Sequence, residues 1–132
     1  MYIYRAKCVR VVDGDTVDLI IDLGFRMTTY QRIRLLGVDT PELNDTDVSK
    51  REEAKEARDR VRELLVDGMN DEAVLQKLDK GAARTYPLII ESEKADSFGR
   101  WLARIRYPLP TGGWASLADT LIDEELAVVY SR

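Results

Sequence analysis

Three β-prone segments follow one another in the first 38 residues, with no helical stretch between them. Their β-branched and aromatic side chains predict strands near 2–12, 15–23 and 28–37. The first two are joined by Asp13-Gly14-Asp15, and Asp-Gly is a strong hairpin signal. Because strands and helices do not alternate here, a doubly wound sheet is a poor match for this part of the chain.

Apolar residues then recur at helical spacing and predict a helix over 49–66, with Ala54, Ala57, Val61, Leu64 and Leu65 inside. Ser49 and Glu52 form a candidate capping box, and Gly68 stands where a C-terminal cap is expected. The charged outer face of this helix is interpreted as a solvated surface laced with ion pairs.

The rest of the chain predicts a short helix over 71–79, strands near 85–92 and 99–107, a helix over Ser116–Ile122 and an extended segment over Leu126–Tyr130. A loop is expected at Pro108–Gly113. The predicted fold is α+β and mainly β, because five strands with a helix between the third and fourth suit a small barrel.

A length of 132 residues predicts one domain spanning 1–132. No apolar run exceeds the five residues of Leu126–Tyr130, whereas a membrane-spanning helix needs about 20. The N-terminus lacks the basic-then-apolar layout of a signal peptide. A cytoplasmic monomer that makes no membrane contact is expected, unless a leader has been removed.

The chain has no histidine and one cysteine, Cys8. This excludes an intramolecular disulfide, a zinc site built on Cys and His, and catalysis by histidine. Any chemistry must use carboxylates, arginine, lysine, hydroxyls or a metal held by oxygen. The net charge of −4 argues mildly against binding nucleic acid through bulk charge but leaves a local basic site open.

Three clusters of polar residues could carry such chemistry: Asp13-Gly14-Asp15-Thr16, Arg34 to Glu42, and Asp96 to Arg100. Taken singly, they are a plain turn, a strand end and one half of a surface ion pair. Arg34 and Asp39 are five residues apart and would face opposite sides of a regular strand. A shared site therefore predicts an irregularity at Gly37-Val38.

Together the clusters favour phosphoryl chemistry. Pro41 has no N–H, so the Thr40 carbonyl is left free. This carbonyl and the carboxylates of the clusters are oxygen ligands of the kind that Ca²⁺ or Mg²⁺ binds. The guanidinium groups of Arg34 and Arg100 can each bind two phosphate oxygens through two parallel hydrogen bonds. Glu42 is a spare carboxylate that can accept a proton from an attacking water.

In this order, the stretches Val11–Val17, Arg34–Glu42 and Phe98–Arg100 resemble the staphylococcal nuclease (thermonuclease) family. The resemblance implies an OB-fold, a five-stranded barrel with two or three helices. It also implies a metal-dependent endonuclease, with Ca²⁺ expected ahead of Mg²⁺ or Mn²⁺. The enzyme would hydrolyse phosphodiester bonds of DNA, RNA or both to 3′-phosphate ends, with single strands preferred.

By position in the motifs, the resemblance implies a metal held by Asp15, Asp39 and Thr40, with Asp13 behind them through water. Arg34 and Arg100 would bind the scissile phosphate, Glu42 would be the general base, and Phe98 and Tyr130 would contact the nucleotide. Glu125 stands where the family pattern often has glycine.

Two other classes remain open. One is a catalytically idle OB-fold module that binds single-stranded nucleic acid or a protein partner. The other is a purely structural acidic domain. Retention of Arg34, Glu42 and Arg100 separates the nuclease from both.

Overall fold

The computed structural model of the protein describes residues 2–78, 81–95 and 100–130. Its strands are β1 (Tyr2–Asp13), β2 (Thr16–Gly24), β3 (Met27–Leu35), β4 (Val38–Asp39), β5 (Leu88–Ala95), β6 (Trp101–Pro108), β7 (Trp114–Ser116) and β8 (Val128–Val129). Its helices are α1 (Val48–Arg62), α2 (Glu72–Lys77), α3 (Ala82–Thr85) and α4 (Leu117–Asp123). A π-helical turn, Glu63–Asp67, and a 3₁₀ turn, Gly68–Asn70, extend α1.

Five strands close into a barrel. β1 pairs antiparallel with β2 and β5, β2 pairs with β3, and β5 pairs with β6. A short parallel contact between β3 and β6, from Ile33 opposite Trp101 to Leu35 opposite Ala103, completes the ring. This closed, mixed barrel with helices is an OB-fold, as the sequence predicted. Within the described ranges there are four helices rather than two or three, because α3 was not anticipated.

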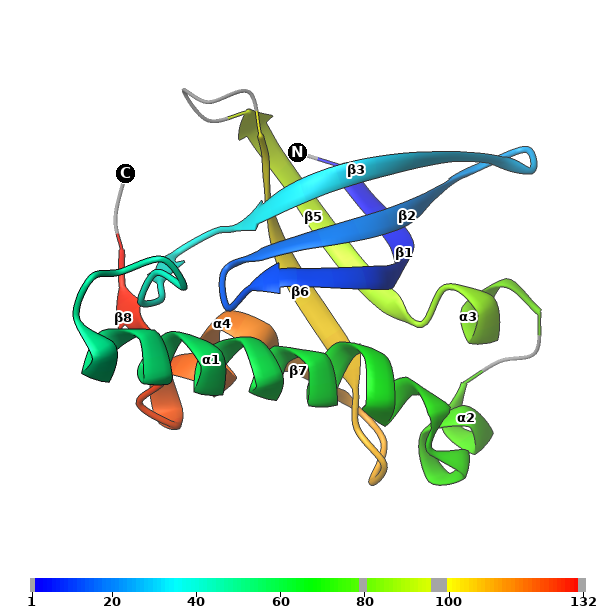
Figure 1. Ribbon diagram of the computed structural model, residues 1–132. Helices are drawn as coiled ribbons and strands as arrows, with labels where there is room; N and C mark the ends of the chain where they lie inside the picture. The colour runs from blue at the N-terminus through cyan, green and yellow to red at the C-terminus, as the bar shows by residue number, and fades with distance from the viewer. Residues whose placement is uncertain (1, 79–80, 96–99, 131–132) are drawn as a thin grey trace.

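The core fills the barrel and continues beneath α1. Alternate side chains of the strands point inward, among them Leu19, Leu88, Ile90 and Ile105, which are almost fully buried. Figure 1 shows α1 lying across one end of the barrel, with α4 behind it, while the β2–β3 hairpin projects away. No helix among the described residues is both long and apolar enough to cross a membrane.

Cys8 belongs to this core, as expected, and burial raises the pKa of its thiol to about 11. On α1 the buried positions are Ala54, Ala57 and Val61, which confirms the helical spacing in the sequence. The small size of the two alanines lets the helix lie close against β1.

The predicted N-cap of α1 was wrong. The helix begins after Asp47, whose Oδ1 accepts the Ser49 N–H at 2.9 Å, so Asp47 and not Ser49 is the N-cap. Asp47 ends a polar loop in an extended conformation, as an N-cap requires. Gly68 is the C-cap of the π turn that extends α1, and its N–H donates to the Glu63 carbonyl, but its φ of −63° is right-handed and the chain continues into a 3₁₀ turn.

The irregularity expected near Gly37 is present. β3 ends at Leu35, Gly37 has a φ of +90°, and the chain then pairs Val38 and Asp39 with β8. Only glycine adopts that φ without strain. The bend turns Asp39 back toward the strand that carries Arg34.

The segment between β6 and α4 is also more ordered than predicted. The proposed loop at Pro108–Gly113 is the turn of a hairpin, and Trp114, Ala115 and Ser116 return along β6 as β7. Glycines with positive φ at 112 and 113 make this tight turn possible.

Replacing Glu125 with glycine is expected to raise the free energy of unfolding by about 0.5–1 kcal/mol, since Glu125 has a φ of +61°. The gain is smaller than the strain relieved because glycine also loses more freedom on folding. Urea denaturation measures the change. As a control, Glu124→Gly lies at φ −87° and loses a bidentate ion pair with Arg60, so it should destabilise; equal effects of the two changes would contradict the strain argument.

Candidate active site

Arg34, near the end of β3, joins two of the predicted carboxylates. Its guanidinium lies 3.4 Å from Asp15 Oδ2 through one terminal nitrogen and 3.1 Å from Asp39 Oδ1 through the other. It also donates to the Leu35 carbonyl at 3.0 Å. Arg34 and Asp15 are buried, whereas the Asp39 side chain is 52% exposed. A buried cation is thus fixed between an inner and an outer carboxylate.

Asp13 and Asp15 share a surplus of negative charge. Burial, together with a hydrogen bond to Asp15 and the charge on it, raises the pKa of Asp13 to about 7. Burial also opposes ionisation of Asp15, but the hydrogen bond with Asp13 and the charge of Arg34 outweigh it and lower the pKa of Asp15. The two carboxylates therefore titrate as a pair, and ionisation of one makes ionisation of the other less favourable.

The turn that carries these two residues is held against Thr40. The Thr40 N–H donates to Asp15 Oδ2 at 3.1 Å. A Cβ added to Gly14 would lie 2.8 Å from Ala57 Cβ and 2.9 Å from Thr40 Cγ2. The φ of Gly14 lies outside the left-handed region, so close contact and not backbone freedom requires glycine there. Gly14 thus brings the turn, helix α1 and Thr40 together.

Thr40 has a polar atom that is left over. Its Oγ1 is buried and has no hydrogen-bond partner among the described residues. A buried hydroxyl normally has a partner, because leaving one unpaired costs about 1–3 kcal/mol. The site therefore retains an unused oxygen beside the Asp13–Asp15 pair.

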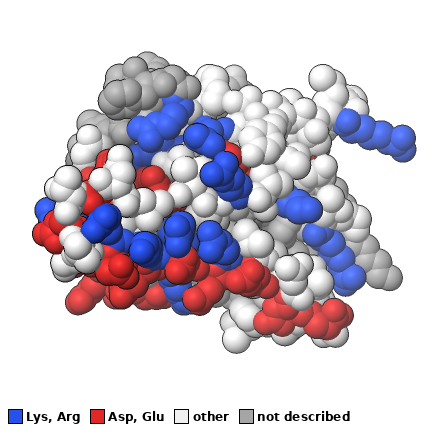
Figure 2. All heavy atoms as spheres, in the orientation of Figure 1, with Lys and Arg blue, Asp and Glu red and all other residues white. Residues whose placement is uncertain are grey.

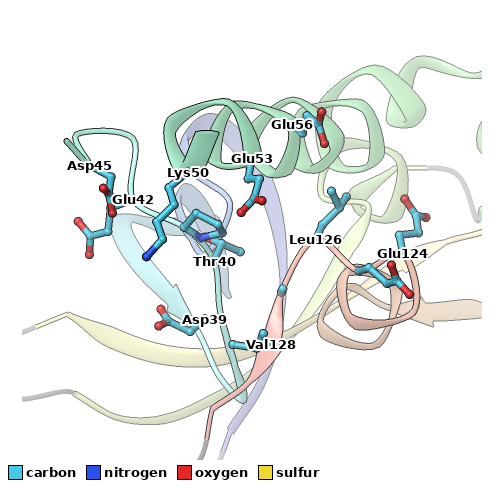
Figure 3. A pocket seen from close by; sticks show the side chains of 13 residues that line it. Asp39, Thr40, Glu42, Asp45, Lys50, Glu53, Glu56, Glu124, Leu126 and Val128 are labelled. Atoms are coloured by element: carbon cyan, nitrogen blue, oxygen red, sulfur yellow. The ribbon is translucent and has the colours of Figure 1, made fainter. Parts of the chain in front are cut away.

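A pocket of about 600 Å³ opens beside these groups, between the 39–45 segment, α1 and the 124–128 segment. Figure 3 shows Asp39, Glu42, Asp45 and Lys50 at one side of it and Glu56 and Glu124 at the other. Lys50 is the basic residue among the lining side chains that the structure describes. The acidic ones are Asp39, Glu42, Asp45, Glu53, Glu56, Glu124 and Glu125.

Glu42 lies at the exposed side of this pocket, one residue beyond Pro41. The Asp45 N–H donates to the Glu42 carbonyl at 3.2 Å, which closes a turn and places the Glu42 side chain beside the pocket opening. Its carboxylate is open to solvent, in contrast to Asp15.

The remaining predicted residues are placed less completely. Arg100 immediately precedes β6, two residues before Leu102, which is the register partner of Arg34. The two arginines therefore come from neighbouring strands. Tyr130 follows β8, and its N–H donates to the Gly37 carbonyl at 2.9 Å, so it anchors the bend before Asp39. Phe98 lies outside the described residues.

Helix α1 contributes to this site in a way that its sequence pattern did not predict. Lys50, Glu53 and Glu56 were assigned to a solvated face, yet they line the pocket. Their spacing of three residues was the available signal, since it places them on one side of the helix. The sequence pattern could not show that this face of α1 and Glu42 line the same pocket.

A model of the family described as staphylococcal nuclease homologue matches residues 32–132. This range holds Arg34, Asp39, Thr40, Glu42 and Arg100. The chain belongs to the staphylococcal nuclease homologue family. The Asp13–Asp15 turn precedes the matched range but contacts it through Arg34 and Thr40.

A relative from Methanocaldococcus jannaschii, the uncharacterized protein MJ1439, is 31% identical over 114 residues. The match covers 77% of this chain and 48% of that protein. The present chain therefore spans about half the length of the relative. The family match confirms the resemblance to the staphylococcal nuclease family, and it includes the clusters from Arg34 to Glu42 and from Asp96 to Arg100.

Proposed function

We propose that the protein is a metal-dependent endonuclease that hydrolyses phosphodiester bonds of DNA, RNA or both. The observation that carries the proposal is the buried Arg34 guanidinium set between Asp15 and Asp39. Burying a charge is costly unless it is paired, and a structural barrel has no need of it. Membership of the staphylococcal nuclease homologue family supports the same assignment.

In this proposal the two arginines bind the scissile phosphate. Arg34 uses two N–H groups in hydrogen bonds to Leu35 and Asp39 and has five in all, which leaves donors for a phosphate oxygen. Arg100 approaches from the neighbouring strand. Together they stabilise the additional negative charge that develops on the phosphoryl oxygens as water attacks.

Glu42 is proposed to accept the proton of the attacking water, which its exposed position beside the pocket allows. The water oxygen forms a bond to phosphorus, and the bond from phosphorus to the 5′-oxygen of the next nucleotide breaks. That oxygen takes a proton from solvent. The phosphate stays on the 3′-oxygen, so the products carry 3′-phosphate and 5′-hydroxyl ends.

The residues present fit a divalent cation with oxygen ligands. The Asp15 N–H donates to Asp13 Oδ1 at 3.1 Å, which holds the two residues together in the turn, and the buried Thr40 Oγ1 has no hydrogen-bond partner among the described residues. Asp15, Asp39 and Thr40 would hold the ion, with Asp13 behind them, and Ca²⁺ is proposed because it accepts irregular oxygen sites completed by water. The ion would supply positive charge at the phosphoryl oxygens.

Replacing Glu42 with glutamine is expected to lower cleavage of labelled single-stranded DNA and of RNA by about a hundredfold to ten-thousandfold, because the proton acceptor is lost. Stability should be unchanged, since the side chain is exposed. The assay is run with Ca²⁺, with Mg²⁺ and with chelator. Asp45→Asn, at the same side of the pocket, is the matched control and should cut normally. Full activity of Glu42→Gln would remove Glu42 from the mechanism.

The second candidate is an idle OB-fold module that binds single-stranded nucleic acid. One observation favours it: no three acidic, histidine or cysteine side chains in the described ranges are grouped as a metal site. In that case the folded protein would bind oligonucleotides but cut them in no metal. A calorimetric titration of the protein with Ca²⁺ would then give no heat of binding.

A further inference from the structure

Most of the charged residues on α1 and at its C-terminal end fall into two parallel rows. Four basic residues recur at intervals of four, three and four, which places them on one stripe of the helix: Arg51, Lys55, Arg58 and Arg62. Four acidic residues repeat the same intervals one position later: Glu52, Glu56, Asp59 and Glu63. The basic stripe lies between the buried alanines and the acidic row. Figure 2 shows this row of Lys and Arg along α1, with Asp and Glu beneath it.

Basic residues continue from the stripe onto the barrel. α1 packs against β1, whose Lys7 and Arg10 are exposed on either side of a register shift. Arg10 is the register partner of Asp18, and Asp18 is the partner of Arg32 on β3. Figure 2 shows further Lys and Arg side chains above the row on α1. We call the stripe together with Lys7, Arg10 and Arg32 the basic surface.

Asp18 is a carboxylate within the barrel part of the basic surface, and its charge is neutralised by Arg32. Asp18 is buried, accepts two hydrogen bonds from Arg32 at 2.8 and 3.1 Å, and accepts a third from the Tyr30 hydroxyl at 2.9 Å. On the stripe, the pairs of Lys55 with Glu52 and of Arg58 and Arg62 with Asp59 are exposed. Such pairs contribute little, so the cations can exchange them for another anion.

We propose that the basic surface binds the sugar-phosphate backbone of a nucleic-acid strand whose scissile phosphate lies in the candidate active site. The proposal rests on the proposed function and extends it. Proximity carries it: Gly14, in the turn that holds Asp13 and Asp15, packs against the buried Ala57 of α1, which the stripe borders. Arg51 to Arg62 spans about 16 Å along the helix, close to five steps of a stacked strand.

A lipid surface fits these observations less well. Membrane-binding helices present an apolar face beside their basic residues, whereas the apolar residues of α1 are buried in the barrel. Regularly spaced cations match a polyanion with regularly spaced charges. The net charge of −4 does not reveal this surface, because the acidic residues are gathered in the row below the stripe and in the pocket.

The test uses a variant in which the four stripe residues become glutamine, which keeps helix propensity. In the control variant, four exposed residues outside the basic surface become glutamine instead: Lys77, Arg84, Arg104 and Arg106. Both variants lose the same charge. Binding of labelled single strands of 4 and 20 nucleotides is followed by fluorescence anisotropy in EDTA at several salt concentrations, after circular dichroism has shown that both variants fold.

The stripe variant should bind the long strand about tenfold or more weakly, and the slope of log K against log salt should fall by up to about 3, or 0.7 for each lost phosphate contact. The advantage of the long strand over the short one should shrink. If the control variant lost the same affinity for the long strand, the loss would be due to net charge alone, and the proposal would be overturned.

Two further outcomes separate this proposal from the nuclease assignment. Stripe-dependent binding by a protein that cuts nothing in Ca²⁺ would support the surface and count against the nuclease. Cleavage by the wild-type protein together with unchanged long-strand affinity in the stripe variant would overturn the surface alone.

Stripe-dependent binding to phosphatidylserine vesicles, without any effect on oligonucleotides, would assign the surface to membranes and overturn the proposal.

Discussion

Arg34→Gln is expected to lower cleavage by about a hundredfold to a thousandfold, because a charged donor to the developing phosphoryl charge is lost. It should also cost about 3 kcal/mol of unfolding free energy, since Asp15 keeps its buried charge without its cation. The cost stays at the lower end because Asp39, the other partner, is half exposed to water. Single-turnover cleavage and urea denaturation measure the two losses.

Arg104→Gln is the matched control. Arg104 also lies near two carboxylates, Glu91 and Glu93, at 3.7 and 3.4 Å, but its side chain is exposed on β6. Removing it should change stability by less than about 1 kcal/mol and leave cleavage unchanged. If both variants lost similar stability, Arg34 would be one more surface arginine and the assignment of a buried cation would be wrong.

Gly14→Ala is the second change with a large expected effect. The added methyl group would meet Ala57 at 2.8 Å and Thr40 at 2.9 Å, and neither neighbour is a flexible chain end. Helix α1 or the Thr40 segment must move, which should cost about 1–3 kcal/mol of stability. Because Asp15 and Thr40 would shift with it, cleavage should fall by about a hundredfold.

The double variant Gly14→Ala/Ala57→Gly tests the cause. Ala57→Gly alone should cost about 1 kcal/mol in the helix, yet in the double variant it removes the shorter of the two contacts. The double variant should therefore be more stable than the sum of the single effects by at least about 0.5 kcal/mol. Simple additivity would show that the contact between the turn and α1 does not cause the loss.

The sequence predicted the elements more reliably than their ends. Alternating and helical spacing identified the barrel strands and α1, because these patterns reflect burial over many residues. The N-cap of α1 was wrong because Ser49 and Asp47 suit an N-cap equally well on chemistry, and only the path of the preceding loop selects Asp47. β7 was missed because its three residues give too short a pattern to read.

The candidate site shows the same division. The bend at Gly37 was predicted from two residues, Arg34 and Asp39, that had to share a site despite opposite strand faces, and the positive φ of Gly37 confirms it. The packing of Gly14 against Ala57 could not be predicted, because it joins a turn to a helix far along the chain. The membership of Lys50 and Glu53 in the pocket depends on that same packing.

The parallel contact between β3 and β6 has a consequence for how the protein matures. It joins Ile33–Leu35 to Trp101–Ala103, so the ring cannot close until most of the chain is available. Contacts between residues distant in sequence form late, because a long loop must first be ordered. Arg34 and Arg100 lie on the two sides of that seam. A chain emerging from the ribosome, close to messenger RNA, therefore acquires its proposed cutting site only when its folding is nearly complete.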